Sequence, residues 1–108
     1  MYVGRMGRHG VSLKPIAKRI AGLWDTIMRE GERATLHTHD SYEELYYIVD
    51  GEAKIKIGDE ELTVSRGDVV YIPPGVNHNV EAVSSLRIIS FKVYTGNHNL
   101  DLNRLYIS

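Results

Sequence analysis

Two of the five histidines, His37 and His39, are separated by a single residue. If residues 33–39 form a strand, side chains two positions apart point to the same face, with their Cα atoms about 6.5–7 Å apart. Two imidazoles at that separation can converge on one metal ion. Pairs of polar residues with this spacing also occur by chance on exposed strand faces, so the pair alone leaves both interpretations open.

Glu44 and His78 are two further candidate donors. Glu44 opens the next expected strand, from which its carboxylate can swing toward the histidine pair, and His78 follows the turn at Pro73-Pro74-Gly75. Three imidazoles and one carboxylate suit Mn, Fe, Ni, Cu, Co or Zn. The expected cofactor is one divalent transition metal, and its candidate ligands are His37, His39, Glu44 and His78.

Short strands must position these residues, because turn residues break the chain at short intervals from Leu23 onward. The Asp50-Gly51 and Gly58-Asp59 pairs between apolar runs are hairpin signals. Polar and apolar residues alternate in 52–57, as in half-buried antiparallel strands. The expected strands cover 23–29, 33–39, 44–49, 52–57, 61–65, 69–72, 77–83 and 86–94. About eight strands at this spacing predict an all-β barrel or jelly-roll sandwich, whereas 13–21 could be a short helix or an extended arm.

The fixed residues fall into two spaced sets. Gly31 is followed after five residues by His37-Thr38-His39, after four more by Glu44 and after six more by Gly51. Gly67 is followed after five residues by Pro73-Pro74-Gly75 and after two more by His78. This pattern resembles the two motifs of the cupin superfamily over roughly residues 23–94. The resemblance implies a double-stranded β-helix, or jelly-roll cupin barrel, with a metal inside its mouth held by His37, His39, Glu44 and His78.

The resemblance also assigns roles around the ligands. It makes Gly51, Gly67 and Gly75 turn positions that need positive φ or close approach. The second motif normally ends in Asn, where this chain has Ala82, which puts the nearby pocket wall in doubt. Counting back six residues from Gly51 selects Glu44, so Glu43 is expected to be a surface acid facing away from the barrel lumen.

Alternation then predicts the lining of the lumen. Tyr46 and Ile48 should face inward with Glu44, Thr35 with His37, and Val80 and Ala82 with His78. The cavity would be mostly apolar with one or two hydroxyls, which suits a small molecule. Tyr46 is the candidate catalytic residue, through a hydrogen bond to a ligand or a metal-bound water; a core aromatic is the alternative. Trp24 is expected to serve in packing.

The 108 residues make one domain, and without cysteine the chain has no disulfide or thiolate site, as in a reducing cytoplasm. No segment is apolar over the length of a membrane helix. Residues 1–20 carry five basic and no acidic residues, whereas the rest carries eight basic and 14 acidic. We expect a basic N-terminal arm at 1–20 that lies on an acidic body or exchanges between subunits, a barrel at 21–96 and a tail at 97–108. His9 in the arm and His98 near the tail are expected to be solvated.

These expectations favour a metal-dependent enzyme of the dioxygenase or isomerase type acting on a small organic substrate. Arg33 is the one lysine or arginine within the two motifs, which is too little basic charge to hold a phosphate, and this disfavours sugar phosphates. The alternative is a non-catalytic cupin that binds or senses a metal or small ligand.

Strands that are apolar on both faces predict a homodimer. Five scattered charges make a weak basic patch, so neither nucleic acid nor a membrane is expected as a partner.

Overall fold

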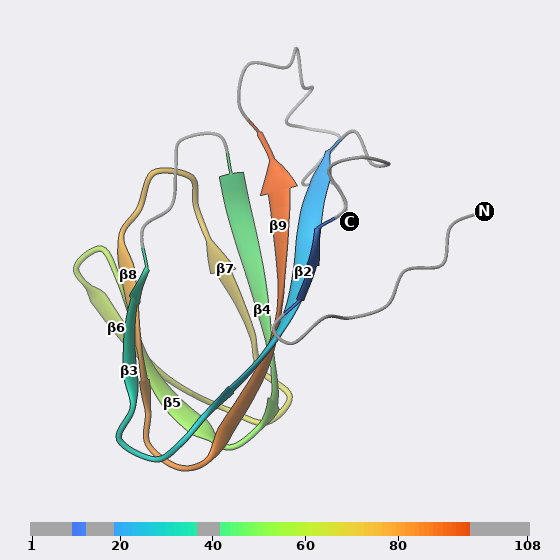
Figure 1. The fold of residues 1–108 in the computed structure, drawn as a ribbon. Helices are drawn as coiled ribbons and strands as arrows, with labels where there is room; N and C mark the ends of the chain where they lie inside the picture. Colours follow the sequence, from blue (N-terminus) through green and yellow to red (C-terminus); the bar gives the residue numbers. More distant parts are fainter. Residues whose placement is uncertain (1–9, 13–18, 37–41, 96–108) are drawn as a thin grey trace.

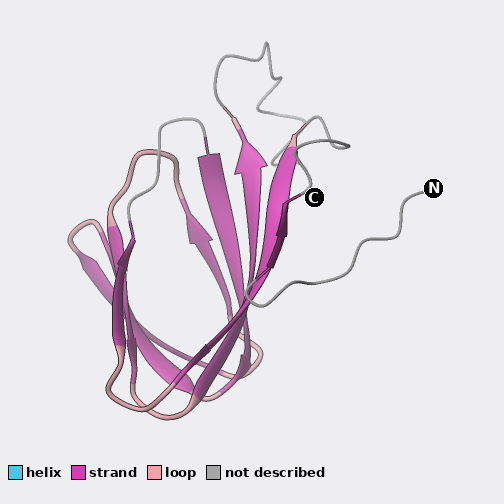
Figure 2. Cartoon of the chain, viewed as in Figure 1, coloured by secondary structure: helices cyan, strands magenta, loops and turns pink. Residues whose placement is uncertain are grey.

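Two antiparallel sheets face each other in the computed structural model, which describes residues 10–12, 19–36 and 42–95 (Figure 1). Sheet A has the order β1 (Gly10–Ser12), β2 (Ile20–Met28), β9 (Leu86–Tyr94), β4 (Tyr42–Asp50) and β7 (Val69–Ile72). Sheet B has the order β3 (Arg33–Leu36), β8 (His78–Ala82), β5 (Glu52–Ile57) and β6 (Glu60–Ser65). The described residues contain no helix, so none that could cross a membrane (Figure 2). The predicted all-β jelly roll is confirmed.

The strand bounds agree with the sequence-based expectation to within about three residues wherever they are described. The main difference lies in the expected arm. β2 begins at Ile20, and β1 pairs with β2 of the same chain, with Gly10 opposite Trp24. Residues 13–18 lie outside the described part, so the choice between helix and extended arm there, like the exchange of the arm between subunits, remains a prediction.

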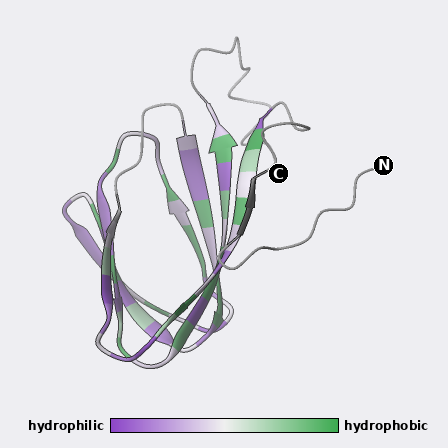
Figure 3. Cartoon of the chain, in the orientation of Figure 1, coloured by the Kyte–Doolittle hydropathy of each residue, from purple (hydrophilic) through white to green (hydrophobic). Residues whose placement is uncertain are grey.

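The core lies between the inner faces of the two sheets. Period-two alternation sends every second side chain inward, and Figure 3 shows hydrophilic and hydrophobic residues alternating along the strands. Ile48 of β4, Ile72 of β7 and Leu86 of β9 meet Ile55 of β5 in one buried cluster. Such packing between two sheets supplies most of the apolar burial that stabilises the fold.

The turn between β4 and β5 depends on Gly51. Its φ is 88°, in the left-handed region, and a Cβ there would collide with the Ser85 carbonyl oxygen and lie 2.9 Å from the Leu86 Cα. Gly67 and Gly75 also have positive φ, 91° and 74°. The prediction that these three glycines occupy special turn positions is therefore confirmed.

Candidate metal and ligand site

The barrel interior changes character along its length. On the inner face of β4, the sequence runs from Ile48 through Tyr46 to Glu44, and all three are buried. β9 changes in the same direction, from Leu86 and Ile88 to Ser90 and Lys92. The polar end of the interior is defined here by Glu44, Tyr46, His78, Ser90 and Lys92. The apolar end is defined by Ile48, Ala53, Ile55, Ala82 and Leu86.

His78 comes to the polar end as the first residue of β8 and is 1% exposed. Its Nδ1 lies 3.3 Å from the Val76 carbonyl oxygen, and its Nε2 lies 3.0 Å from the Tyr46 hydroxyl. Because a carbonyl can only accept, this geometry places the proton on Nδ1 and the lone pair of Nε2 inside the barrel. A carbonyl that fixes the tautomer in this way is typical of metal-binding histidines.

Tyr46 connects the two sheets, since it reaches from β4 to His78 on β8. Burial, followed by the charge of the Glu44 carboxylate and a hydrogen bond to it, raises the pKa of Tyr46 well above its ordinary value of 10.0. The phenol therefore stays protonated at any physiological pH and can donate to His78 or to Glu44. Glu44, which is 4% exposed, and His78 thus lie around one hydroxyl.

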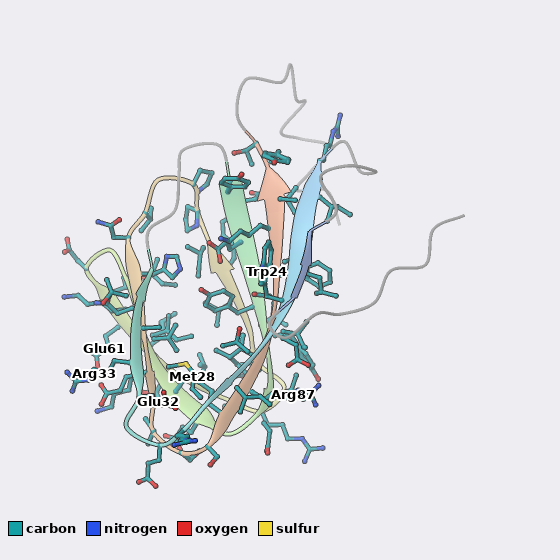
Figure 4. All side chains as sticks on the ribbon, viewed as in Figure 1. Trp24, Met28, Glu32, Arg33, Glu61 and Arg87 are labelled. Carbon is teal, nitrogen blue, oxygen red and sulfur yellow. The ribbon has the colours of Figure 1, made fainter. Side chains whose placement is uncertain are left out.

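A cavity of about 220 Å³ opens beside this group. Its apolar wall includes Met28, Ala34, Val80 and Ile88, and its polar wall includes Thr26, Ser90 and Glu44. Figure 4 shows Met28 deep between the sheets and Trp24 nearer the upper end. The lining is mostly apolar, as predicted, but it has three hydroxyls rather than one or two, and two charged side chains, Glu44 and Lys92.

Lys92 is a site residue that the sequence analysis missed. It lines the cavity, and its Nζ lies 4.0 Å from Glu44 Oε1 and 5.1 Å from the centroid of the Trp24 ring. Every second residue from Leu86 faces inward, and Lys92 is the third after it in this series. The expectation that the strand 86–94 is apolar on both faces hides this inward lysine. The expectation that sugar phosphates are disfavoured considered only the basic residues within the two motifs, and Lys92 lies beyond them.

One predicted orientation, that of Thr35, and one predicted exposure, that of Glu43, are wrong. Thr35 is exposed and pairs with Asn79 on the outer face, because Ala34 is the β3 residue that packs against the core. Glu43 does face away from the lumen, as predicted, but it is 8% exposed rather than a surface acid, and its Oε2 accepts a 2.7 Å hydrogen bond from Tyr71. The outer face of sheet A is thus more covered at this point than alternation alone implies.

Ala82 lies at the apolar end, opposite Ala53 in the strand pairing. It is part of the buried cluster and does not line the cavity. The departure from the usual Asn therefore leaves the wall of this cavity unaffected.

Two of the four predicted metal ligands, His37 and His39, lie outside the described residues. Within 10–12, 19–36 and 42–95, no three histidine or acidic side chains gather in a group that could hold a metal ion. The two ligands that are described have chemistry that fits one: a buried carboxylate and a buried imidazole with an inward lone pair.

Comparison with known proteins defines the class. The Cupin domain family model matches residues 24–92, and the chain belongs to this family. An uncharacterized protein of Methanocaldococcus jannaschii is 34% identical over 64 residues, which make up 59% of this chain and 51% of the relative. The chain spans about half the length of the curated relatives that it matches.

Solved structures agree on the architecture. A predicted oxalate decarboxylase from Thermotoga maritima superposes with a TM-score of 0.72 at 20% identity, covering 81% of this chain and 77% of that chain. A cupin protein from Bacteroides fragilis gives 0.69 at 23% identity, covering 93% and 86%. At these identities the likeness shows the fold alone.

Proposed function

We propose that this chain is a metal-dependent cupin whose barrel binds one divalent transition metal and a small organic ligand at the polar end. One observation carries the proposal: a buried carboxylate and a buried imidazole from opposite sheets meet around the Tyr46 hydroxyl. Burying these groups in an otherwise apolar barrel costs free energy that an ion held by both would offset. The cytoplasm remains the expected location.

His37, His39, Glu44 and His78 would hold the metal, and Mn, Fe, Ni, Cu, Co and Zn all suit such a set. When bound, the ion supplies a Lewis acid beside the cavity. Tyr46 is the candidate catalytic residue. Its phenol keeps its proton, which in this structure it can donate to His78 or Glu44. With both residues bound to the metal, the phenol would be free to donate a hydrogen bond to an oxygen of a ligand in the cavity.

The proposed metal binding is tested by titrating the full, chelator-treated chain with Co²⁺ and following the visible absorption of the ion. The proposal expects one equivalent to bind, His78→Ala to abolish binding, and His98→Ala to leave it unchanged. Tight binding of one equivalent by the double variant His37→Ala/His78→Ala would contradict it.

Two alternative functions would use this site: that of an enzyme of the dioxygenase or isomerase type, and that of a non-catalytic binding or sensing protein. The cavity beside Tyr46 favours the enzyme, because a ligand-sized space lined by this residue is a feature that binding a metal alone does not need. Oxygen uptake and isomerisation by the metal-loaded chain, measured across small organic substrates, separate the two. Ligand binding without turnover would assign the binding protein.

We also propose that the outer face of sheet A joins two copies of the chain. Two rows of exposed apolar side chains cross it, Tyr71–Leu45–Phe91 and Val69–Tyr47. The charged pair on the same face, Asp25 with Arg87, is neutralised internally, so two copies of this face would not repel each other.

The oligomeric state is measured by light scattering at micromolar protein concentration. A dimer is expected, and Tyr47→Lys should make it monomeric because the charge would be buried between the copies. Thr63→Lys, on the outer face of sheet B, is the matched control and should stay dimeric. A monomeric parent chain would contradict the proposal.

A further inference from the structure

The cavity at the polar end holds one feature that a metal site by itself does not require, the Lys92 ammonium. Of the described residues that line the cavity, Lys92 is the one with a cationic side chain. β9 pairs it with Glu44 of β4 on one side and Gly22 of β2 on the other. The backbone of sheet A therefore fixes where this lysine enters the cavity.

The surroundings of Lys92 contact its ammonium group without accepting a hydrogen bond from it. The Nζ lies 5.1 Å from the Trp24 ring centroid and 6.0 Å from the Tyr42 ring centroid, distances at which aromatic faces stabilise a cation. Glu44 Oε1, at 4.0 Å, is too far for a hydrogen bond. Among the described residues, no group accepts a hydrogen bond from this ammonium, whose side chain is 37% exposed and which has three N–H donors to offer.

Charge balance then favours an anion. In the metal-free cavity, Glu44 and Lys92 compensate each other. A divalent ion bound by Glu44 would leave the cavity with the full charge of that ion. A carboxylate placed next to Lys92 would offset part of that charge.

We propose that the cavity takes a small carboxylate with an apolar body, and that Lys92 is the residue that binds its carboxylate group. The proposal rests on the proposed function in that both use the cavity at the polar end. The Lys92 ammonium would donate to the carboxylate while Met28, Val80 and Ile88 contact the apolar body. A cavity of about 220 Å³ lies below the usual range for drug-sized ligands, which restricts the body to about one ring or a short branched chain.

The mostly apolar wall selects against more strongly hydrated anions. Inorganic phosphate would need several polar partners, and beyond Lys92 the described lining offers the hydroxyls of Thr26, Tyr46 and Ser90 next to the acidic Glu44. A carboxylate with an apolar body gains from the wall as well as from the ammonium.

Benzoate is the probe, benzamide is its neutral counterpart of equal shape, and phosphate is the inorganic anion. Binding is measured on the full chain by calorimetry and by the emission of Trp24, the single tryptophan, excited where benzoate does not absorb. Because Trp24 lies beside Lys92, its emission should change on saturation with benzoate. We expect benzoate to bind at least about 10-fold more tightly than benzamide, equivalent to about 1.4 kcal/mol, and phosphate not to compete.

The variants isolate the ammonium. Lys92→Gln should remove the preference for benzoate and leave benzamide binding unchanged, whereas Lys92→Arg should keep the preference. Lys54→Gln, on the exposed outer face of sheet B, is the matched control and should behave like the parent chain. Equal binding of benzoate and benzamide by the parent chain, equal loss of both in Lys92→Gln, or no benzoate binding at all would overturn the proposal.

The metal is measured separately on the same samples with Co²⁺. Lys92→Gln should still bind one equivalent, since Lys92 is not a ligand. If Co²⁺ fails to bind while the Lys92-dependent preference for benzoate holds in chelator-treated protein, the metal proposal falls and the carboxylate proposal stands. If Co²⁺ binds and the Lys92-dependent preference for benzoate is absent, the metal proposal stands and the carboxylate proposal falls.

Discussion

The two ends of the barrel interior are made by the same strands but have different tasks. At the apolar end, Ile48, Ile55 and Leu86 are packed in the buried cluster. At the polar end, Glu44 and His78 are as deeply buried, although each could be charged. Packing at one end therefore provides the stability that lets the other end keep costly polar groups out of water. Substitutions at the two ends should consequently change different measured quantities.

The largest effect is expected from Ile55→Ala at the apolar end. Removing a fully buried side chain leaves a cavity, and such changes cost about 2–5 kcal/mol of unfolding free energy. Urea denaturation measures this loss, and the metal affinity of the folded protein should be unchanged. Leu62→Ala, at the partly exposed cross-strand neighbour of Ile55, is the control and should cost clearly less. Equal losses would mean that the apolar end is not the stabilising one.

At the polar end, Glu44→Gln should change metal affinity rather than stability. Losing an anionic ligand is expected to weaken Co²⁺ binding about 100-fold or more, which equals about 2.7 kcal/mol. Glu43→Gln, on the neighbouring residue that faces the other way, should leave the affinity unchanged. Equal weakening by both variants would show that the inward assignment of Glu44 is wrong.

Tyr46→Phe tests whether the polar end depends on its hydroxyl. In chelator-treated protein, the buried Nε2 of His78 would lose its donor, which costs about 1–3 kcal/mol of unfolding free energy. With Co²⁺ bound, His78 would have the ion as its partner, so the cost should shrink. Thermal unfolding with and without Co²⁺ measures both values, and an equal cost in the two states would contradict the pairing of His78 with the metal.

The smallest effect is expected at Asp25, on the outer face of sheet A. Its bidentate pairing with Arg87 lowers the pKa of Asp25 below its ordinary value of 3.8. A lowered carboxyl pKa adds stability above the pKa of the unfolded chain, and this contribution is lost as the pH falls through the folded value. Asp25→Asn should therefore cost a small, salt-sensitive amount of unfolding free energy at neutral pH, and its difference from the parent should disappear as the pH falls through the folded pKa of Asp25. A difference that persists in acid would point to packing rather than charge.

The sequence predicted the strands, the buried cluster and the inward direction of Glu44, because period-two alternation survives in long, regular strands such as β4. It failed at Thr35, which was expected on the inner face, whereas the pairing of β3 with β8 places Thr35 opposite Asn79 on the outer face. It missed Lys92 because a lysine at a strand end looks solvated until β2 and β4 are placed beside it. The burial of Glu43 likewise depends on Tyr71, a tertiary contact that no local pattern contains.

The pairing of β9 between β2 and β4 also has a kinetic consequence. The hairpin of β5 and β6 closes over a short turn, whereas β2 and β4 are joined into one sheet only by β9, the last described strand. Contacts between residues distant in the chain slow folding, so we expect refolding on the millisecond-to-second scale of other non-local β proteins. Glu44 and Lys92 face each other across the β4–β9 pair. The charged part of the cavity is therefore expected to assemble in the final step of folding, when sheet B can already be in place.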